Sequence, residues 1–170
     1  PRLGIVGALS CVHLIDGGIG EELESRGYRL LRMPLSESLW FLCGDAAPSP
    51  DRQRIAELFA RTLRAIDKAC QGDSPFSADP ASLTRDADAL FPRFAGGLGR
   101  YRAAKAVQLS RSCDAVLSMA PEYENTEAVL SLARLPLSGP LFRCAVGGMW
   151  EADAWSALDS FLHYVKRPNA

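Results

Sequence analysis

The chain of 170 residues carries a formal net charge of −1, with 48% hydrophobic and 23% charged residues. This length suits one domain with its own core, and the composition is typical of folded globular proteins. The balanced charge argues against a nucleic-acid partner, because phosphate-binding surfaces usually carry a clear excess of Lys and Arg. The longest apolar runs, such as residues 39–43, are far shorter than the ~20 residues of a membrane-spanning helix, which argues against a membrane partner.

Cysteine usage and the start of the chain bear on its context. Five cysteines lie at long, irregular intervals without a C-x-x-C pair: Cys11, Cys43, Cys70, Cys113 and Cys144. This pattern fits free thiols in a reducing compartment, and no signal peptide is visible, so we expect a cytoplasmic protein. The sequence starts at Pro1 and not at Met, and a strand-like run begins at Leu3. We therefore expect residues 1–170 to form a single α/β domain that belongs to a longer chain.

Short apolar runs alternate with helical patterns in the first part of the chain. The run 3–9 predicts a buried strand, and the pattern after it predicts a helix that Asp16 caps and Gly27 ends. Residues 28–33 predict a second strand, and residues 36–42 predict a short apolar helix capped by its first residue, a serine.

The middle of the chain departs from this alternation. Residues 51–70 place apolar side chains at three- and four-residue intervals, which predicts a long helix. Residues 71–92 contain one glycine and three prolines with little periodicity, which predicts an irregular excursion. Long irregular connections serve as lids or are disordered, and either would suit a surface that meets another domain. We treat residues 45–95 as a variable insertion within the domain.

The alternation resumes in the second half. The patterns predict a helix over 98–111, a strand over 114–119, a helix starting at Thr126, a strand over 141–146 and a helix over 151–166. The whole order predicts a three-layer α/β fold, flavodoxin-like or Rossmann-like, with a parallel sheet of about four strands, an inserted helix and an irregular excursion. Ligands of such folds bind at the carboxyl ends of the strands, so we expect a site there.

A glycine-rich segment opens the helix over 98–111. Gly96, Gly97 and Gly99 precede Arg100, and Arg102 and Lys105 add further positive charge. Backbone amides and a helix N-terminus favour an anion, so these residues are a candidate phosphate, carboxylate or coenzyme site. The segment matches no phosphate-loop signature, which favours the alternative of a flexible hinge between the irregular excursion and the helix.

Two carboxylates and a phenol follow the strand over 114–119. Glu122, Tyr123 and Glu124 stand where ligands of parallel sheets bind, and paired carboxylates can divide acid and base work. The alternative is a solvated acidic turn before the next helix. A Cys11–His13 pair is a weaker catalytic candidate, and the two histidines are too sparse for a metal site.

The order of elements and several motifs resemble one known family. RLGIVG at 2–7, MPLSE at 33–37 with Trp40 and Phe41 after it, and CDAVLSM at 113–119 are similar to the C-terminal domain of the 2-hydroxyacyl-CoA dehydratase and benzoyl-CoA reductase family. The related activator (activase-like) proteins look similar too. The resemblance covers most of the chain except roughly residues 45–95, and it implies a bacterial, cytoplasmic protein.

The resemblance breaks at the loop after the third expected strand. There the family carries a Pro-Phe-x-Cys-Met-Pro-Glu pattern whose cysteine ligates a 4Fe-4S cluster. Pro121 and Glu127 match that pattern, but Glu124 stands at the cysteine position. A carboxylate is a poor substitute for a thiolate in an iron-sulfur site, so we expect no cofactor and no metal in this domain.

Three functions remain open. The leading hypothesis is an accessory or degenerate domain of a dehydratase- or activator-related protein, non-catalytic alone, which packs against other domains of its parent chain or a partner subunit. The second is an enzyme domain in which Glu122, Tyr123 and Glu124 act on a CoA thioester held near Gly97 and Arg100. A flavodoxin-like flavin binder is the third, by analogy of fold alone.

Overall fold

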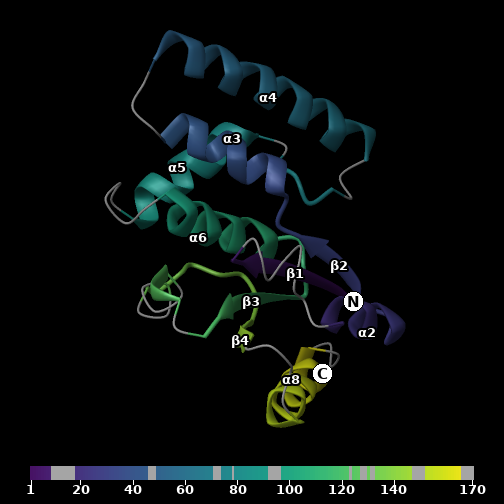
Figure 1. The fold of residues 1–170 in the computed structure, drawn as a ribbon. Coiled ribbons are helices and arrows are strands. Elements are labelled where there is room, and N and C mark those ends of the chain that lie inside the picture. Colours follow the sequence, from purple (N-terminus) through teal and green to yellow (C-terminus); the bar gives the residue numbers. More distant parts are fainter. Residues whose placement is uncertain are drawn as a thin grey trace.

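A parallel four-stranded sheet forms the centre of the protein (Figure 1). The computed structural model describes residues 1–8, 18–45, 49–70, 74–77, 79–91, 97–122, 124–126, 130, 133–146 and 152–165. The strands in this part are β1 (Arg2–Gly7), β2 (Arg29–Arg32), β3 (Ala115–Pro121) and β4 (Leu141–Val146). Their order is β2-β1-β3-β4, and every neighbouring pair is parallel. The α/β class predicted from the alternating pattern is confirmed.

The two central strands are the most deeply buried part of the sheet. Leu3 of β1 lies opposite Leu30 on one side and Ala115 on the other, and both β1 and β3 are buried over almost their whole length. Helices cover both faces of the sheet, so side chains that point to either face are buried from solvent. This explains why these strands are continuous apolar runs without polar alternation.

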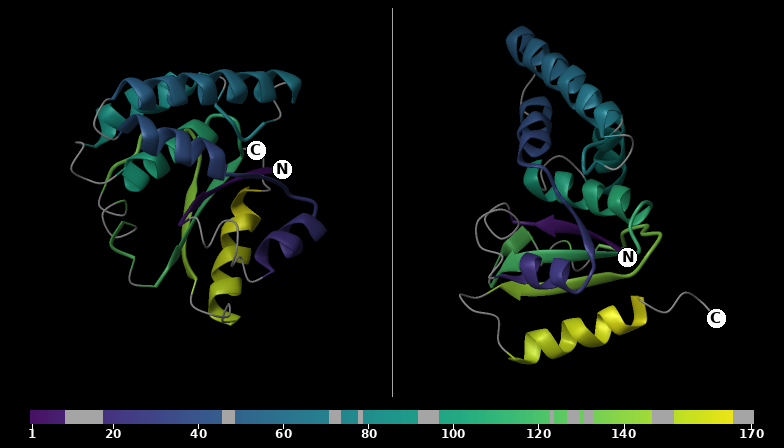
Figure 2. Two further views of the ribbon diagram at one scale, coloured as in Figure 1. Left: turned by 45° about the horizontal axis from the view of Figure 1, so that its top comes forward. Right: turned by 90° about the vertical axis from the view of Figure 1, so that its right-hand side faces the viewer.

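Helices cover the two faces of the sheet unequally (Figures 1 and 2). On one face lie α2 (Ile19–Ser25) and α8 (Ala152–Val165), and on the other lies α6 (Gly97–Ser110). Further helices stack on α6, namely α3 (Leu35–Asp45), α5 (Pro80–Leu90) and, outermost, α4 (Pro50–Ala69). None of the helices that the structure describes combines the length and apolar character needed to cross a bilayer.

Gly4 allows α6 to approach the sheet closely. A side-chain carbon added at Gly4 would lie 2.9 Å from Cβ of Leu109 on α6, nearer than unbonded carbons come. Leu109 is itself buried, so it has no solvent space into which to retreat. The missing side chain at Gly4 therefore fixes how deeply α6 sits on β1.

Part of the region expected to be irregular is helical. The expectation for residues 71–92 is wrong over α5, because Asp79 accepts a hydrogen bond from the amide of Ala81 and Pro80 occupies the first turn, where proline is favoured. The helix then buries Leu83 and Ala87, four residues apart on one face. The capping residue and one apolar stripe therefore stabilise α5, although its sequence shows little helical periodicity.

Helix starts differ from the expectation in two further places. The N-cap of α2 is Gly18, in the left-handed conformation, and not Asp16, which lies outside the described residues. Helix α3 begins at Leu35, one residue before the serine expected to cap it.

Gly27 has a φ of 84°, which confirms the left-handed residue expected at the end of α2. The helix expected from Thr126 lies largely outside the described residues.

Candidate functional site

The carboxyl edge of the sheet brings together the two candidate groups that the sequence indicates. Glu122 and Glu124 follow β3, and the first part of α6 lies beside this segment, since Arg102 contacts Glu124 and Gly99 lies against Thr126. A side chain added at Gly99 would come 3.0 Å from Cγ2 of Thr126, so the helix start packs directly on the chain after β3. The glycine thus serves close packing at this position.

Some of the candidate residues lie outside the described part of the chain. These are Gly96, Tyr123, Cys11 and His13. Of the carboxylate pair, Glu122 is exposed at the edge and Glu124 is half-buried. The two carboxylates therefore occupy different environments.

Glu124 is held by a two-pronged ion pair with Arg102 of α6. Nη1 of Arg102 donates to Oε2 at 2.9 Å, and Nη2 donates to Oε1 at 2.7 Å. The arginine side chain is 3% exposed and the glutamate side chain 23% exposed. Both carboxylate oxygens face a rigid, planar donor, the strongest geometry available to such a pair. Glu124 in this arrangement links α6 to the segment after β3, and both of its oxygens accept hydrogen bonds from Arg102.

Arg100 points to a different part of the molecule from Glu124. Its side chain is fully buried, its guanidinium forms an ion pair with Asp88 of α5, and it lies 5.9 Å from the ring centroid of Phe41 on α3. The positive charge is therefore compensated within the helical layers. Of the anion-binding candidates that the structure describes, Gly99 lies against Thr126, two residues after Glu124, whereas Arg100 ties α6 to α3 and α5.

A buried polar cluster that the sequence analysis missed lies between α3 and α6. Glu37 and Lys105 both have fully buried side chains, and Nζ of Lys105 lies 2.5 Å from Oε2 of Glu37. The same oxygen accepts a hydrogen bond from the hydroxyl of Tyr101 at 2.8 Å, and Oε1 accepts one from the amide of Ser77 at 2.6 Å. Lys105 also donates to Oε1 of Gln108 at 2.9 Å. Both oxygens of the buried carboxylate are satisfied.

The environment of Tyr101 keeps its hydroxyl protonated. Burial, then the negative charge of Glu37 and the hydrogen bond to it, raises the pKa of Tyr101 well above the usual value of a phenol. The tyrosine therefore acts as a hydrogen-bond donor in this cluster. The sequence held a signal for the cluster, since Glu37 is a charged residue just before the apolar run 39–43 and Lys105 stands among alanines.

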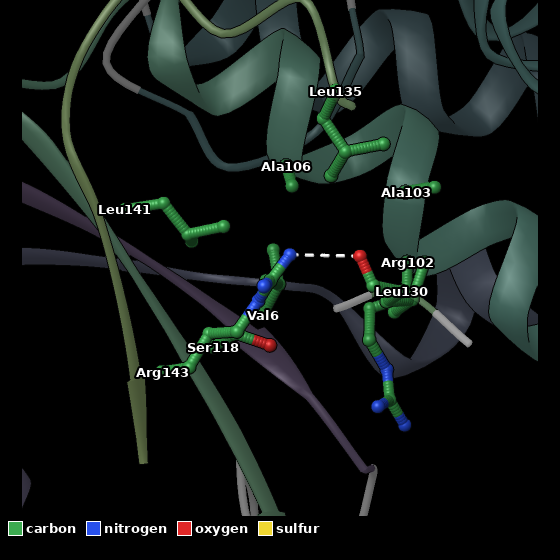
Figure 3. A pocket seen from close by; sticks show the side chains of 9 residues that line it. All are labelled: Val6, Arg102, Ala103, Ala106, Ser118, Leu130, Leu135, Leu141 and Arg143. Carbon is green, nitrogen blue, oxygen red and sulfur yellow. Dashed lines mark hydrogen bonds between the residues drawn. The ribbon is translucent and has the colours of Figure 1, made fainter. Parts of the chain in front are cut away.

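A small cavity lies between α6 and the β4 side of the sheet (Figure 3). Val6, Ala106, Leu135 and Leu141 are among the residues that line it, and the space open to the centre of a water molecule is about 10 Å³. That volume suits ~1 water molecule, so an acyl chain does not fit in this conformation.

The two arginines at this cavity are directed toward different partners. Arg143 donates from Nη2 to the carbonyl oxygen of Leu130 at 2.7 Å, whereas the guanidinium of Arg102 points away from Arg143 (Figure 3). The two positive groups therefore do not converge on one anion position in the cavity.

The thiols and acidic side chains are dispersed. Among the described cysteines Cys113 is buried, and burial raises the pKa of its thiol above the usual value. Within the described ranges no group of three or more His, Cys, Asp or Glu side chains is arranged to hold a metal ion. The donors needed for a metal centre are therefore not assembled in this part of the chain.

Comparison with known proteins leaves the geometry as the basis for assigning a function. No protein-family model matches the sequence, and neither a curated protein nor a solved structure matches it. The pairing of Glu124 with Arg102 is the most distinctive feature of the carboxyl edge.

Proposed function

We propose that this chain is an accessory domain, related to the 2-hydroxyacyl-CoA dehydratases and their activator proteins, that performs no chemistry alone. In this proposal the domain packs against other domains of its parent chain or against a partner subunit in a bacterial cytoplasm. Its carboxyl edge serves as a fixed structural surface and not as a reaction site.

The observation that carries the proposal is the ion pair between Arg102 and Glu124. Glu124 stands where the resemblance places a cluster cysteine, and its two oxygens face the guanidinium of a nearly fully buried arginine. A carboxylate in this geometry contributes a cross-link between α6 and the β3 exit. We infer that an internal ion pair has taken the place of the ligand-holding side chain at this edge.

The competing function is an enzyme domain that acts on CoA thioesters through Glu122, Tyr123 and Glu124. It would need a reactive carboxylate that faces the substrate, a cation for the coenzyme phosphates and space for the acyl group. Glu124 and Arg100 instead have internal charge partners, and the nearby cavity suits a water molecule. These three features favour the accessory role.

Calorimetric titration separates the two functions. We expect acetyl-CoA and free CoA to give no binding heat with the wild-type chain or with Glu124→Gln at ligand concentrations up to ~1 mM, the weak end of specific affinities. Glu122→Gln tests the other carboxylate of the competing function, which is exposed at the same edge. Binding of acetyl-CoA to the wild type that either substitution weakens would contradict the accessory role and support the enzyme, and a yellow protein on purification would support the flavin binder.

A further inference from the structure

Helix α4 presents an exposed apolar stripe. Of its 20 residues only Leu63 is buried among those whose burial the structure describes. Ile55, Leu58 and Ile66 are 45%, 64% and 37% exposed. With Thr62 between them they follow one another at intervals of three or four residues, so they lie along one side of the helix. The apolar part of α4 is therefore wider than the part that α3 and α5 cover.

Helix α3 extends the apolar area. Leu35 and Leu39, four residues apart, are 45% and 47% exposed. The two helices run antiparallel (Figure 1), and Nε1 of Trp40 donates to the carbonyl oxygen of Ala56 at 2.9 Å. That hydrogen bond places the turn of α3 that carries Leu39 level with the turn of α4 that carries Ile55.

Most of the exposed large apolar side chains lie on these two helices. In the described part of the chain there are seven, of which five are Leu35, Leu39, Ile55, Leu58 and Ile66. We call these five residues the α3–α4 surface. Single exposed apolar residues are ordinary, but a cluster of them on neighbouring helices is typical of an interaction site. Helix α4, which carries three of the five, is the helix farthest from the sheet (Figure 2).

A row of cations borders the stripe. Arg54, Arg61 and Lys68 are all exposed and stand seven residues apart, so they form a line along α4. Leu58 lies four residues after Arg54 and three before Arg61, which puts the cations directly beside the apolar stripe. Glu57 also neighbours both arginines, on the side of the row away from Leu58, and the exposed Arg64 adds positive charge on that side.

We propose that the α3–α4 surface binds an amphipathic helix of a partner protein that carries carboxylates opposite Arg54, Arg61 and Lys68. This inference rests on the accessory role and names the kind of partner that role requires. An apolar seam flanked by complementary charges is the arrangement by which helices select one another. A second copy of this chain fits less well, because antiparallel pairing of two α4 helices about a twofold axis brings the two cation rows together.

Two synthetic peptides test the charge preference. Each is an amphipathic helix of ~20 residues, the length of α4, with the same leucine seam, and one carries Glu and the other Lys at every flanking position. Fluorescence anisotropy measures the affinity of each peptide. We expect the acidic peptide to bind the wild type at least ~10-fold more tightly than the basic peptide. We also expect the acidic peptide to bind less tightly in ~0.5 M salt than in ~0.05 M salt. The triple variant Arg54→Glu, Arg61→Glu, Lys68→Glu should reverse that order.

Single substitutions test the apolar seam. Leu58→Ser should weaken binding of the acidic peptide ~10-fold or more, since its side chain is 64% exposed and centres the stripe. Tyr164→Ser, at the 74% exposed tyrosine of α8, is the matched control and should leave binding unchanged. Equal affinity for both peptides, no binding of the acidic peptide below ~100 μM, or a wild-type dimer that Leu58→Ser dissociates would overturn the proposal. The result of the CoA titration does not depend on these peptide measurements, so the accessory role and the partner helix are tested independently.

Discussion

The ion pair of Glu37 with Lys105 joins two helices through charges that solvent does not reach. Both side chains are fully buried, and the carboxylate also accepts hydrogen bonds from Tyr101 and from the amide of Ser77. Removing one member of such a pair leaves the other charge buried without its counter-ion, which is far more unfavourable than losing an exposed pair.

Substitution of Lys105 measures the strength of this cluster. We expect Lys105→Met to lower the free energy of unfolding by ~3–5 kcal/mol, measured by urea denaturation, because the Glu37 carboxylate loses its counter-ion. Arg85→Met is the control, since its pair with Asp79 is exposed, and we expect a loss below ~1 kcal/mol there. Equal losses for the two variants would show that the buried pair does not hold α3 to α6.

At the scale of elements, the central strands were predictable and the helical layer over α6 was predictable only in part. Strands β1 and β3 are continuous apolar runs because both faces of a parallel sheet are covered, and such runs are legible in one sequence. Helix α5 was missed because Pro80 looks like a breaker, although proline is favoured in a first turn beside a capping aspartate.

The packing of α6 on β1 gives an element-scale test. We expect Gly4→Ala to lower the free energy of unfolding by ~1–3 kcal/mol, because the added carbon meets the Cβ of Leu109 and the helix has to move outward. Thermal unfolding followed by circular dichroism measures the change. Gly18→Ala is an informative contrast, because nothing lies within 4 Å of an added carbon at that position. Any loss in the free energy of unfolding there comes from the left-handed φ of 79° and not from overpacking. An unchanged melting temperature for Gly4→Ala would contradict the close approach of α6.

At the scale of the whole molecule, the sequence predicts the edge of the sheet where a site should lie, but it does not predict how the side chains there pair with one another. The alternation of strands and helices predicted that Glu122 and Glu124 lie at the carboxyl edge, since parallel strands end at one edge. The pairing of Glu124 with Arg102, the turning of Arg100 toward Asp88, and the Glu37 cluster depend on how α6 is rotated over the sheet. That rotation is set by contacts between residues far apart in the chain, which periodicity does not reveal.

The central claim is that Glu124 serves as a structural partner of Arg102. A double-mutant cycle with Arg102→Met and Glu124→Gln, followed by urea denaturation, measures the coupling between them directly. We expect a coupling of ~1–3 kcal/mol between these two residues and almost none between Arg102 and the exposed Glu122. Absence of coupling between Arg102 and Glu124 would contradict the account and return Glu124 to the candidates for chemistry.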